Sequence, residues 1–172
     1  MKTRPLWSNF SLLLLCLITG CLSSCSFVTN SEGVIKSKNL IINFKRAGWK
    51  SIAPDKGDFA FRNEKSKSYI LVNSLCRKYD NTTLEQLTDN LLAGLQRPII
   101  AKQSEKRLFD RSALKTEATG ALDGVKTSML ILVVKKDRCI YDFALISQTE
   151  NLGSTLEADF EQLLNSTQVV SP

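Results

Sequence analysis

Apolar residues recur along this chain with two different periods. An apolar residue at every second position predicts a β-strand, and one at every third or fourth position predicts an amphipathic helix. The first period predicts strands at residues 40–44, 48–52, 58–62 and 69–76. The second predicts two helices, whose apolar stripes are Leu84, Leu87, Leu91 and Leu95 in one and Leu156, Phe160, Leu163 and Leu164 in the other. The chain is therefore expected to fold as an α+β domain.

Capping signals indicate where the two helices begin. Thr82 is the expected N-cap of the first helix, because Glu85 follows three residues later and completes a capping-box pattern. Ser154 and Glu157 repeat this pattern before the second helix. Gly94 and Pro98 are expected to end the first helix.

The pair Asp123-Gly124 is a strong hairpin signal, because both central residues of a type I′ turn have positive φ. The strands predicted around and after this turn cover residues 113–122, 125–134 and 138–147. Residues 99–110 show no clear period and are expected to form a loop with a short strand.

The strands near the hairpin are apolar on both sides. In the strand at residues 125–134, one side carries Met129, Ile131 and Val133, and the other carries Leu130, Leu132 and Val134. The strands of an antiparallel sheet with one solvent-exposed face alternate apolar and polar residues. These strands do not alternate in this way, so both faces of the sheet are expected to be covered. Two helices are available, and the sequence predicts an antiparallel sheet covered on both faces, an α/β/α sandwich.

The order of these elements resembles the Mog1/PsbP-like fold over residues 40–168. The resemblance rests on the Gly48-Trp49 strand, the helix after the 69–76 strand, the Asp123-Gly124 hairpin, the strand of Tyr141 and the final helix. The chain also resembles small Gram-negative lipoproteins of unknown function in the run from Lys135 to Asp142. Both resemblances imply a non-enzymatic binding module, although a fold alone does not define a function.

The N-terminus carries an export signal. Lys2 and Arg4 precede a short apolar run at residues 12–18, which is too short to span a bilayer of about 30 Å and is typical of a signal peptide. The following residues, Ile18-Thr19-Gly20-Cys21, resemble the lipobox of bacterial lipoproteins, so Cys21 is the expected lipidation site. Cys25 ends a second, more distant match, and an ordinary signal peptide cut near residue 23 or 24 is the remaining alternative.

These signals divide the chain into a lipoprotein signal peptide at residues 1–20, a flexible tether at 21–38 and one globular domain at 39–172. Acyl chains on Cys21 would anchor the protein to a membrane. Because Leu22 rather than aspartate follows Cys21, the resemblance favours the outer membrane of a Gram-negative bacterium, with the domain facing the periplasm.

Composition narrows the chemistry. The 172 residues contain no histidine, which excludes catalytic triads and metal sites built on histidine. Phosphate-binding and dinucleotide-binding glycine motifs are also missing from the sequence. Without residues 1–20 the formal net charge is 21 − 17 = +4, which does not indicate nucleic acid binding. No catalytic residue, cofactor site or metal site is therefore assigned.

Two cysteines remain inside the predicted domain, Cys76 at the end of one strand and Cys139 at the start of another. If these strands are antiparallel neighbours, the two residues meet, and the oxidising periplasm would favour a disulfide between them. Two buried free thiols are the alternative.

The sequence leaves two functions open. The first is an accessory module that binds an envelope protein, and the second is a carrier of a lipid or another small apolar ligand. The acidic residues Asp110, Glu117, Asp123 and Asp142 show no spacing that indicates a catalytic pair. The aromatic residues Phe59, Phe61, Tyr141 and Phe143 fit a core, and less readily a ligand groove.

Overall fold

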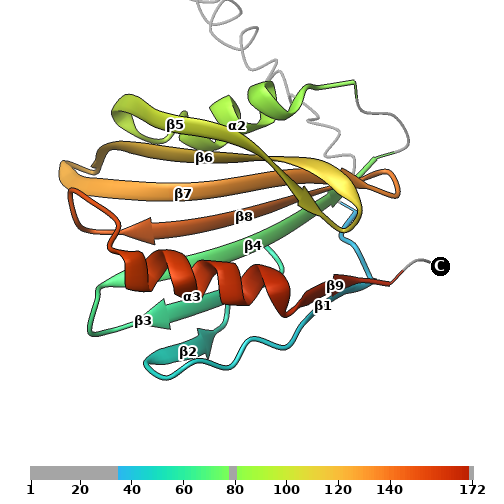
Figure 1. The fold of residues 1–172 in the computed structure, drawn as a ribbon, viewed down its shortest axis with the longest axis horizontal. Coiled ribbons are helices and arrows are strands. Elements are labelled where there is room, and N and C mark those ends of the chain that lie inside the picture. The colour runs from blue at the N-terminus through green and yellow to red at the C-terminus, as the bar shows by residue number, and fades with distance from the viewer. Residues whose placement is uncertain (1–34, 78–80, 171–172) are drawn as a thin grey trace, which may run out of the picture. The chain divides into compact units, whose positions relative to one another are not determined.

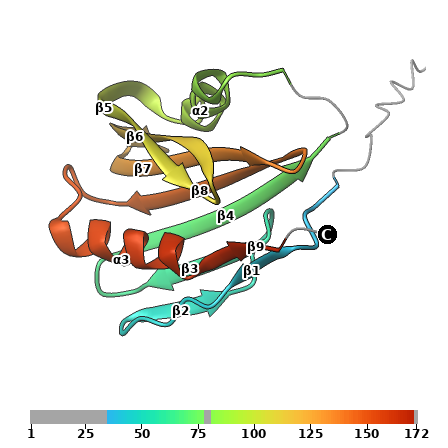
Figure 2. The same ribbon diagram turned by 45° about the vertical axis from the view of Figure 1, so that its right-hand side comes forward.

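Strands dominate the computed structural model of this chain, which describes residues 35–77 and 81–170 (Figures 1 and 2). The strands are β1 (Leu40–Ile42), β2 (Trp49–Ile52), β3 (Phe59–Asn63), β4 (Ser68–Cys76), β5 (Gln96–Leu108), β6 (Arg111–Leu122), β7 (Val125–Lys136), β8 (Cys139–Ser147) and β9 (Thr167–Val169). The helices described are α2 (Leu84–Leu92) and α3 (Ser154–Asn165).

The main sheet has seven strands in the order β2-β3-β4-β8-β7-β6-β5, and every neighbouring pair is antiparallel. β1 and β9 form a separate two-stranded sheet, which joins the first described strand to the segment after α3. The predicted α+β class, a mostly antiparallel sheet with two helices, is confirmed.

The hairpin turn between β6 and β7 has the predicted conformation. Asp123 has φ 49° and Gly124 has φ 78°, as a type I′ turn requires. A similar turn joins β7 to β8 at Asp137 and Arg138, whose φ values are 51° and 63°. β7 therefore continues to Lys136, two residues beyond the predicted end.

The prediction of a loop with a short strand at residues 99–110 was wrong in extent, because the strand continues through Leu108 and only residues 109 and 110 form a turn. This strand is β5, which has 13 residues, lies at the edge of the sheet and pairs with β6. Most of its side chains are exposed, so no apolar alternation marks it in the sequence. Its pairing depends on backbone hydrogen bonds, which the sequence pattern does not record. β9 was not predicted, because three residues are too few to show a period.

Both helix starts differ from the predicted capping pattern. The N-cap of α2 is Thr83 rather than Thr82, and its reciprocal partner is the side chain of Gln86 rather than Glu85. α3 begins at Ser154 itself, after Gly153, which provides no side-chain cap. Either glutamine or glutamate can complete a capping box. The box formed here is therefore the one between Thr83 and Gln86, one residue later than predicted.

Two apolar clusters use alternate residues of the same strands. The first joins Phe160, Leu163 and Leu164 of α3 to strand residues that include Leu130, Leu132, Val134, Phe143 and Leu145. The second joins Leu92, the last residue of α2, and Leu95, which follows the helix, to Met129, Ile131, Val133 and Ile140. Because successive strand residues point to opposite sides of a sheet, we call these sides the α3 face and the α2 face.

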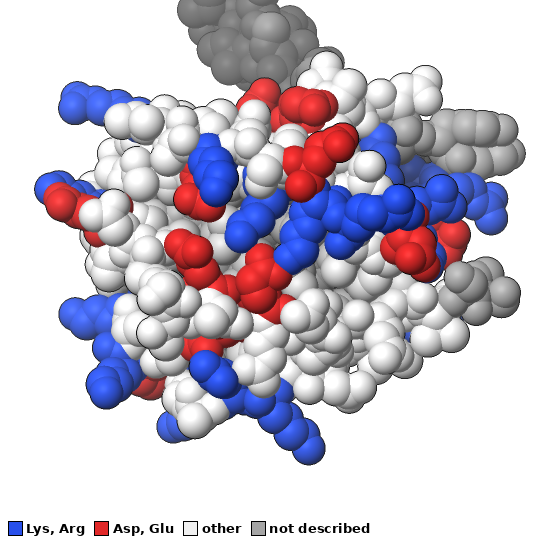
Figure 3. All heavy atoms as spheres, in the orientation of Figure 1, with Lys and Arg blue, Asp and Glu red and all other residues white. Residues whose placement is uncertain are grey.

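Polar contacts reinforce the α3 face. Asp159 of α3 is buried, accepts a hydrogen bond of 2.8 Å from Trp49 Nε1 and forms an ion pair with Arg46. Glu161 pairs with Lys106 and Lys115, which connects α3 to β5 and β6. Acidic and basic side chains are intermixed over the middle of this view of the surface (Figure 3).

Cys76 and Cys139 form a disulfide, with an S–S distance of 2.02 Å and Cα atoms 3.9 Å apart. They lie directly opposite each other on the antiparallel strands β4 and β8. This is the strand arrangement on which the sequence-based expectation of a bridge depended. The bridge fixes the two central strands at the end where β4 finishes.

The folded domain begins earlier than predicted. Ile35 pairs with Cys76, and the backbone N–H of Ser37 donates a 2.8 Å hydrogen bond to Ser74 Oγ. Residues 35–38 were assigned to the tether, but they are part of the compact unit at residues 33–172. The predicted signal peptide, Cys21 and Cys25 lie outside the described residues. In residues 35–77 and 81–170, neither helix has the length and apolar composition needed to cross a bilayer.

Candidate functional site

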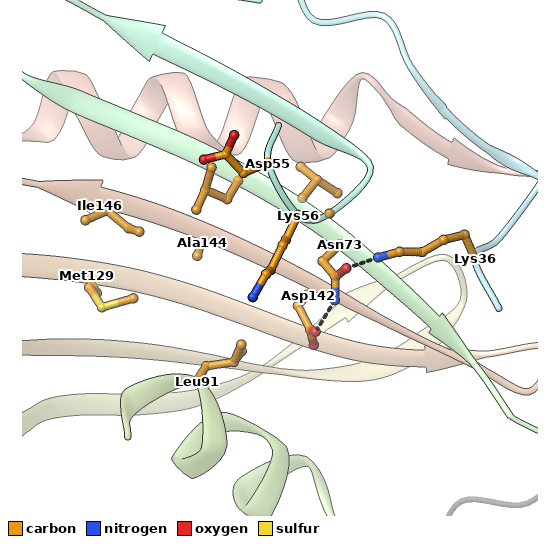
Figure 4. Close-up of a pocket in the computed structure, with 12 residues that line it drawn as sticks. Lys36, Asp55, Lys56, Asn73, Leu91, Met129, Asp142, Ala144 and Ile146 are labelled. Atoms are coloured by element: carbon orange, nitrogen blue, oxygen red, sulfur yellow. Dashed lines mark hydrogen bonds between the residues drawn. The ribbon is translucent and has the colours of Figure 1, made fainter. Parts of the chain in front are cut away.

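A groove with a volume of 730 Å³ lies on the α2 face of the main sheet (Figure 4). Its apolar wall comes from β4, α2, β7 and β8, through Leu71, Leu91, Met129, Ala144 and Ile146. Its polar residues are Lys36, Asp55, Lys56, Asn73 and Asp142. The site therefore combines an apolar floor with a polar, mixed-charge region.

Strand register explains the apolar floor. Ala144 of β8 lies between Leu71 of β4 and Ile131 of β7. Two residues along, Ile146 pairs with Tyr69 on one side and Met129 on the other. The single methyl group of Ala144 fills little space between these larger side chains, which leaves room above β8.

α2 covers only part of this face, which leaves room for the groove. Its nine residues span only about 14 Å at 1.5 Å per residue. The helix packs on β6 and β7, and the α2-face residues of β4 and β8 are left partly uncovered. Leu71 consequently remains 38% exposed, whereas Val72, the next residue on the other face, is 1% exposed.

The loop between β2 and β3 forms one rim of the groove. Gly57 has φ 107°, and a Cβ at this position would lie 3.1 Å from the carbonyl oxygen of Val72. The next residue, Asp58, donates its backbone N–H to the same carbonyl oxygen over 2.9 Å. Glycine is needed here because the loop lies directly against β4 with a positive φ.

A chain of polar contacts organises the polar end. The ammonium group of Lys36 donates a hydrogen bond to Asn73 Oδ1 and lies 3.6 Å from Asp58 Oδ1. Asn73 Nδ2 then donates to Asp142 Oδ2 over 3.3 Å. In Figure 4 the side chain of Lys56 extends across the groove. The polar end thus presents ammonium, amide and carboxylate groups together.

Burial raises the pKa of the Asp142 carboxyl group, while the hydrogen bond from Asn73 and the charge of Lys36 act in the opposite direction. Desolvation disfavours the carboxylate form, and the net direction shows that it is the larger effect. Close by, Asp58 Oδ2 is buried without a hydrogen-bond partner. The groove therefore contains a carboxyl group that is poised to take up a proton more readily than an exposed one.

A second, smaller pocket of 260 Å³ continues the apolar surface toward the β6–β7 turn. It shares Leu71 and Ile146 with the groove and adds Leu122 and Val125, which are 41% and 45% exposed. The two pockets together form an apolar strip along the part of the α2 face that the helix leaves open.

The structure separates the residues that the sequence singled out. Asp110 and Asp123 occupy turn positions with positive φ, and Asp142 alone of the four acidic candidates lines the groove. Phe61, Tyr141 and Phe143 are buried in the α3-face cluster, with Phe59 partly buried against it, so the core interpretation holds for these aromatic residues. No group of three or more potential metal-ligating side chains occurs in the part of the chain that the structure describes.

Sequence reasoning missed the groove residues Lys56, Leu71 and Ala144. The signal that could have revealed them is a mismatch: the strands at residues 69–76 and 138–147 are apolar on both faces, but the helix predicted for one face has few turns. Apolar strand positions without a covering helix mark an open apolar surface.

Known structures share the fold of this domain. The solution structure of cyanobacterial PsbP (CyanoP) from Synechocystis sp. PCC 6803 matches with a TM-score of 0.53 and 15% sequence identity, over 88% of this chain and 100% of that chain. The crystal structure of LpqN, described as involved in cell envelope biogenesis of Mycobacterium tuberculosis, matches with a TM-score of 0.57 and 13% identity, over 81% of this chain and 88% of that chain. At these identities the likeness defines the fold, which is PsbP-like.

Neither a known protein family nor a curated protein matches this sequence.

Proposed function

We propose that this protein is a non-enzymatic binding module of the bacterial cell envelope that holds an amphipathic, single-chain lipid in the groove on the α2 face. One observation carries the proposal: the 730 Å³ groove has an apolar floor and a polar end. Binding sites for small apolar ligands typically have volumes of about 300–1,000 Å³ and a few convergent polar groups.

The polar end favours a head group that both donates and accepts hydrogen bonds. Two ammonium groups, from Lys36 and Lys56, and two carboxyl groups, from Asp58 and Asp142, occur at this end; Lys36 contacts Asp58 and Asn73, and Asn73 donates to Asp142. These charges balance, so a zwitterionic or hydroxylated head fits the site better than a bare anion. The alkyl chain would lie along Ala144 and Ile146, in the direction of the second pocket.

Filling the floor of the groove tests this function. Ala144→Trp places a large side chain there, and Ala101→Trp makes the same change at an exposed position of β5. We expect residues 33–172 to bind the apolar dye N-phenylnaphthylamine and to release it when lysophosphatidylethanolamine is added. Ala144→Trp should weaken dye binding at least about tenfold, by steric exclusion. Equal binding by Ala144→Trp and wild type would refute the lipid site.

A second candidate function uses the same strip. Leu71, Leu122 and Val125 form an exposed apolar surface, of the kind that also marks protein interaction sites. On this hypothesis the domain is an accessory module for an envelope protein. A photo-crosslinking residue at position 71 in living cells would then give one discrete protein adduct, and the isolated domain would not bind the dye.

The attachment to the envelope is part of the proposal. The lipobox-like residues before Cys21 support acylation of this cysteine and placement in the outer membrane. Cys21→Ala should abolish acyl labelling and release the protein from membranes, while Cys25→Ala should change neither. If labelling persists until Cys25 is also replaced, Cys25 is the lipidated residue.

We further infer that α2, the main sheet and α3 form an α/β/α sandwich whose two helical layers are unequal. Successive residues of β7 belong in turn to the apolar cluster on the α2 face and to the one on the α3 face, which supports this arrangement. The partial cover of the α2 face is what makes the groove.

A further inference from the structure

One end of the main sheet gathers chain segments that are far apart in the sequence. The β5–β6 turn lies there, because Leu108 pairs with Arg111. The β7–β8 turn lies beside it, since Lys136 pairs with Cys139. Cys139 in turn faces Cys76, which pairs with Ile35, the first described residue. Two turns, the disulfide and the start of the domain therefore share this end.

This end is strongly basic. Five exposed or half-exposed basic residues occupy it: Arg77, Arg107, Arg111, Lys136 and Arg138. We call this set the basic end. Two acidic residues accompany them, Asp110 and Asp137, and both have the positive φ that their turns require. Aspartate suits such turn positions for conformational reasons, so these two residues are explained by the turns. Figure 3 shows Lys and Arg side chains extending toward the end where these turns lie in Figure 1.

Positive charge exceeds negative charge at the basic end. The basic end carries 5 − 2 = +3, and the formal charge of residues 21–172 is 21 − 17 = +4. A local excess of this kind attracts an anionic surface much more effectively than the same charge spread evenly.

The beginning of the described chain lies at the same end. Ile35 is 65% exposed, and the predicted lipidation site, Cys21, precedes it by 35 − 21 = 14 residues. Fourteen residues reach at most about 50 Å when fully extended. A domain anchored at Cys21 would thus be held within reach of the membrane.

We propose that the basic end docks on the anionic head groups of a phospholipid membrane. Positive charge, exposure and proximity to the expected anchor coincide at this end. The docking is independent of what the groove binds, because none of its five basic residues lines the groove. Its chemistry is the attraction of clustered guanidinium and ammonium groups for lipid phosphates.

Docking in this orientation would bring the groove close to the membrane. Asn73 and Asp142, at the polar end of the groove, lie three residues along β4 and β8 from the disulfide. Three strand residues span about 10 Å. A docked domain would therefore hold the polar end of the groove near the head groups, where single-chain lipids are available.

Vesicle binding tests the docking. Residues 33–172 form a compact unit with its own apolar clusters, so this unit can be studied without the anchor. The test variant combines Arg111→Gln, Lys136→Gln and Arg138→Gln. The control combines Lys50→Gln, Lys65→Gln and Lys67→Gln, which removes the same charge from exposed positions elsewhere. Binding is measured on vesicles of phosphatidylcholine with and without phosphatidylglycerol.

We expect the wild-type unit to bind the vesicles that contain phosphatidylglycerol and to dissociate at high salt. Each charge removed from the basic end should weaken binding about fivefold, and the test variant about a hundredfold. Arg138→Gln alone should weaken vesicle binding about fivefold, because it removes one charge and keeps every other basic residue. The control should lose less than about threefold. Equal losses in the test and control variants, or binding of the wild type without dependence on phosphatidylglycerol, would overturn the proposal.

Discussion

The two faces of the main sheet are formed by the same strands and carry similar apolar side chains, but one face is fully covered and the other is partly exposed. On the α3 face, Phe160 and Leu163 are fully buried and pack on residues of β7 and β8 that are also fully buried. On the α2 face, Leu71 is 38% exposed and borders an open groove. The covering helix has 12 residues on the first face and nine on the second. A shortage of cover, rather than a special set of residues, creates the candidate site.

The chemical character of the two faces also differs. The α3 face contains an aromatic network, in which Phe44 contacts Trp49 and Phe61, and Phe109 contacts Tyr141 and Phe143. The α2 cluster is built mainly from aliphatic residues together with Met129. Edge-to-face aromatic pairs favour one fixed packing, whereas aliphatic side chains and methionine adapt their shape more easily. The first face is therefore packed more rigidly than the second.

The largest difference between the faces should appear when core side chains are truncated. Phe160→Ala removes a fully buried ring from the α3 face and should lower the free energy of unfolding by about 3–5 kcal/mol. Leu71→Ala, on the open face, should lower it by about 1 kcal/mol, because much of that side chain already contacts solvent. Denaturant unfolding of both variants measures the contrast. Similar losses would mean that the two faces are equally packed.

The disulfide should stabilise both faces, because it joins β4 to β8 and these strands contribute to both. Cys76→Ser combined with Cys139→Ser opens a loop closed over 63 residues. The chain-entropy estimate for that loop is about 4 kcal/mol, and we expect a loss of about 2–4 kcal/mol in unfolding experiments. Reduction of the wild type should reproduce the loss. A double variant as stable as the oxidised wild type would contradict this prediction.

A smaller effect is expected at the start of α2, which forms the partial cover. Thr83 Oγ1 accepts the backbone N–H of Gln86, so Thr83→Ala should cost about 1 kcal/mol. Thr82→Ala is the matched comparison, since the sequence pattern favoured Thr82 as the N-cap and Thr83 holds that position in the structure. A larger loss for Thr82→Ala than for Thr83→Ala would show that Thr82 is the N-cap, as the sequence pattern predicted.

The smallest effect concerns the polar end of the groove and depends on pH. Because burial raises the pKa of Asp142, the folded state holds this proton more tightly than the unfolded state does. As pH rises from about 4 through the folded-state pKa, wild-type stability should therefore fall relative to Asp142→Asn, and stay level above it. Unfolding free energies of both proteins across this range test the sign. A relative gain by the wild type would show that the carboxylate form is favoured instead.

Much of the framework followed from local sequence. The Asp123-Gly124 turn was predicted because two adjacent residues suffice to define it, and its φ values agree. The bridge between Cys76 and Cys139 was expected only if their two strands were antiparallel neighbours, and the register of β4 and β8 meets that condition. The length of β5 was underestimated because an edge strand without a buried side shows no alternation. The N-cap of α2 was displaced by one residue because two capping patterns overlap.

The sequence by itself determined that this chain has an antiparallel sheet, two amphipathic helices and strands that are apolar on both sides. The groove could not be predicted from the sequence, because it depends on how much of the sheet α2 covers. The strands that line the groove are distant in the chain. Leu71, Ala144 and Met129 become neighbours only through the register of β4, β8 and β7. Local periodicity records which side of a strand a residue occupies, but only tertiary packing decides whether anything covers it.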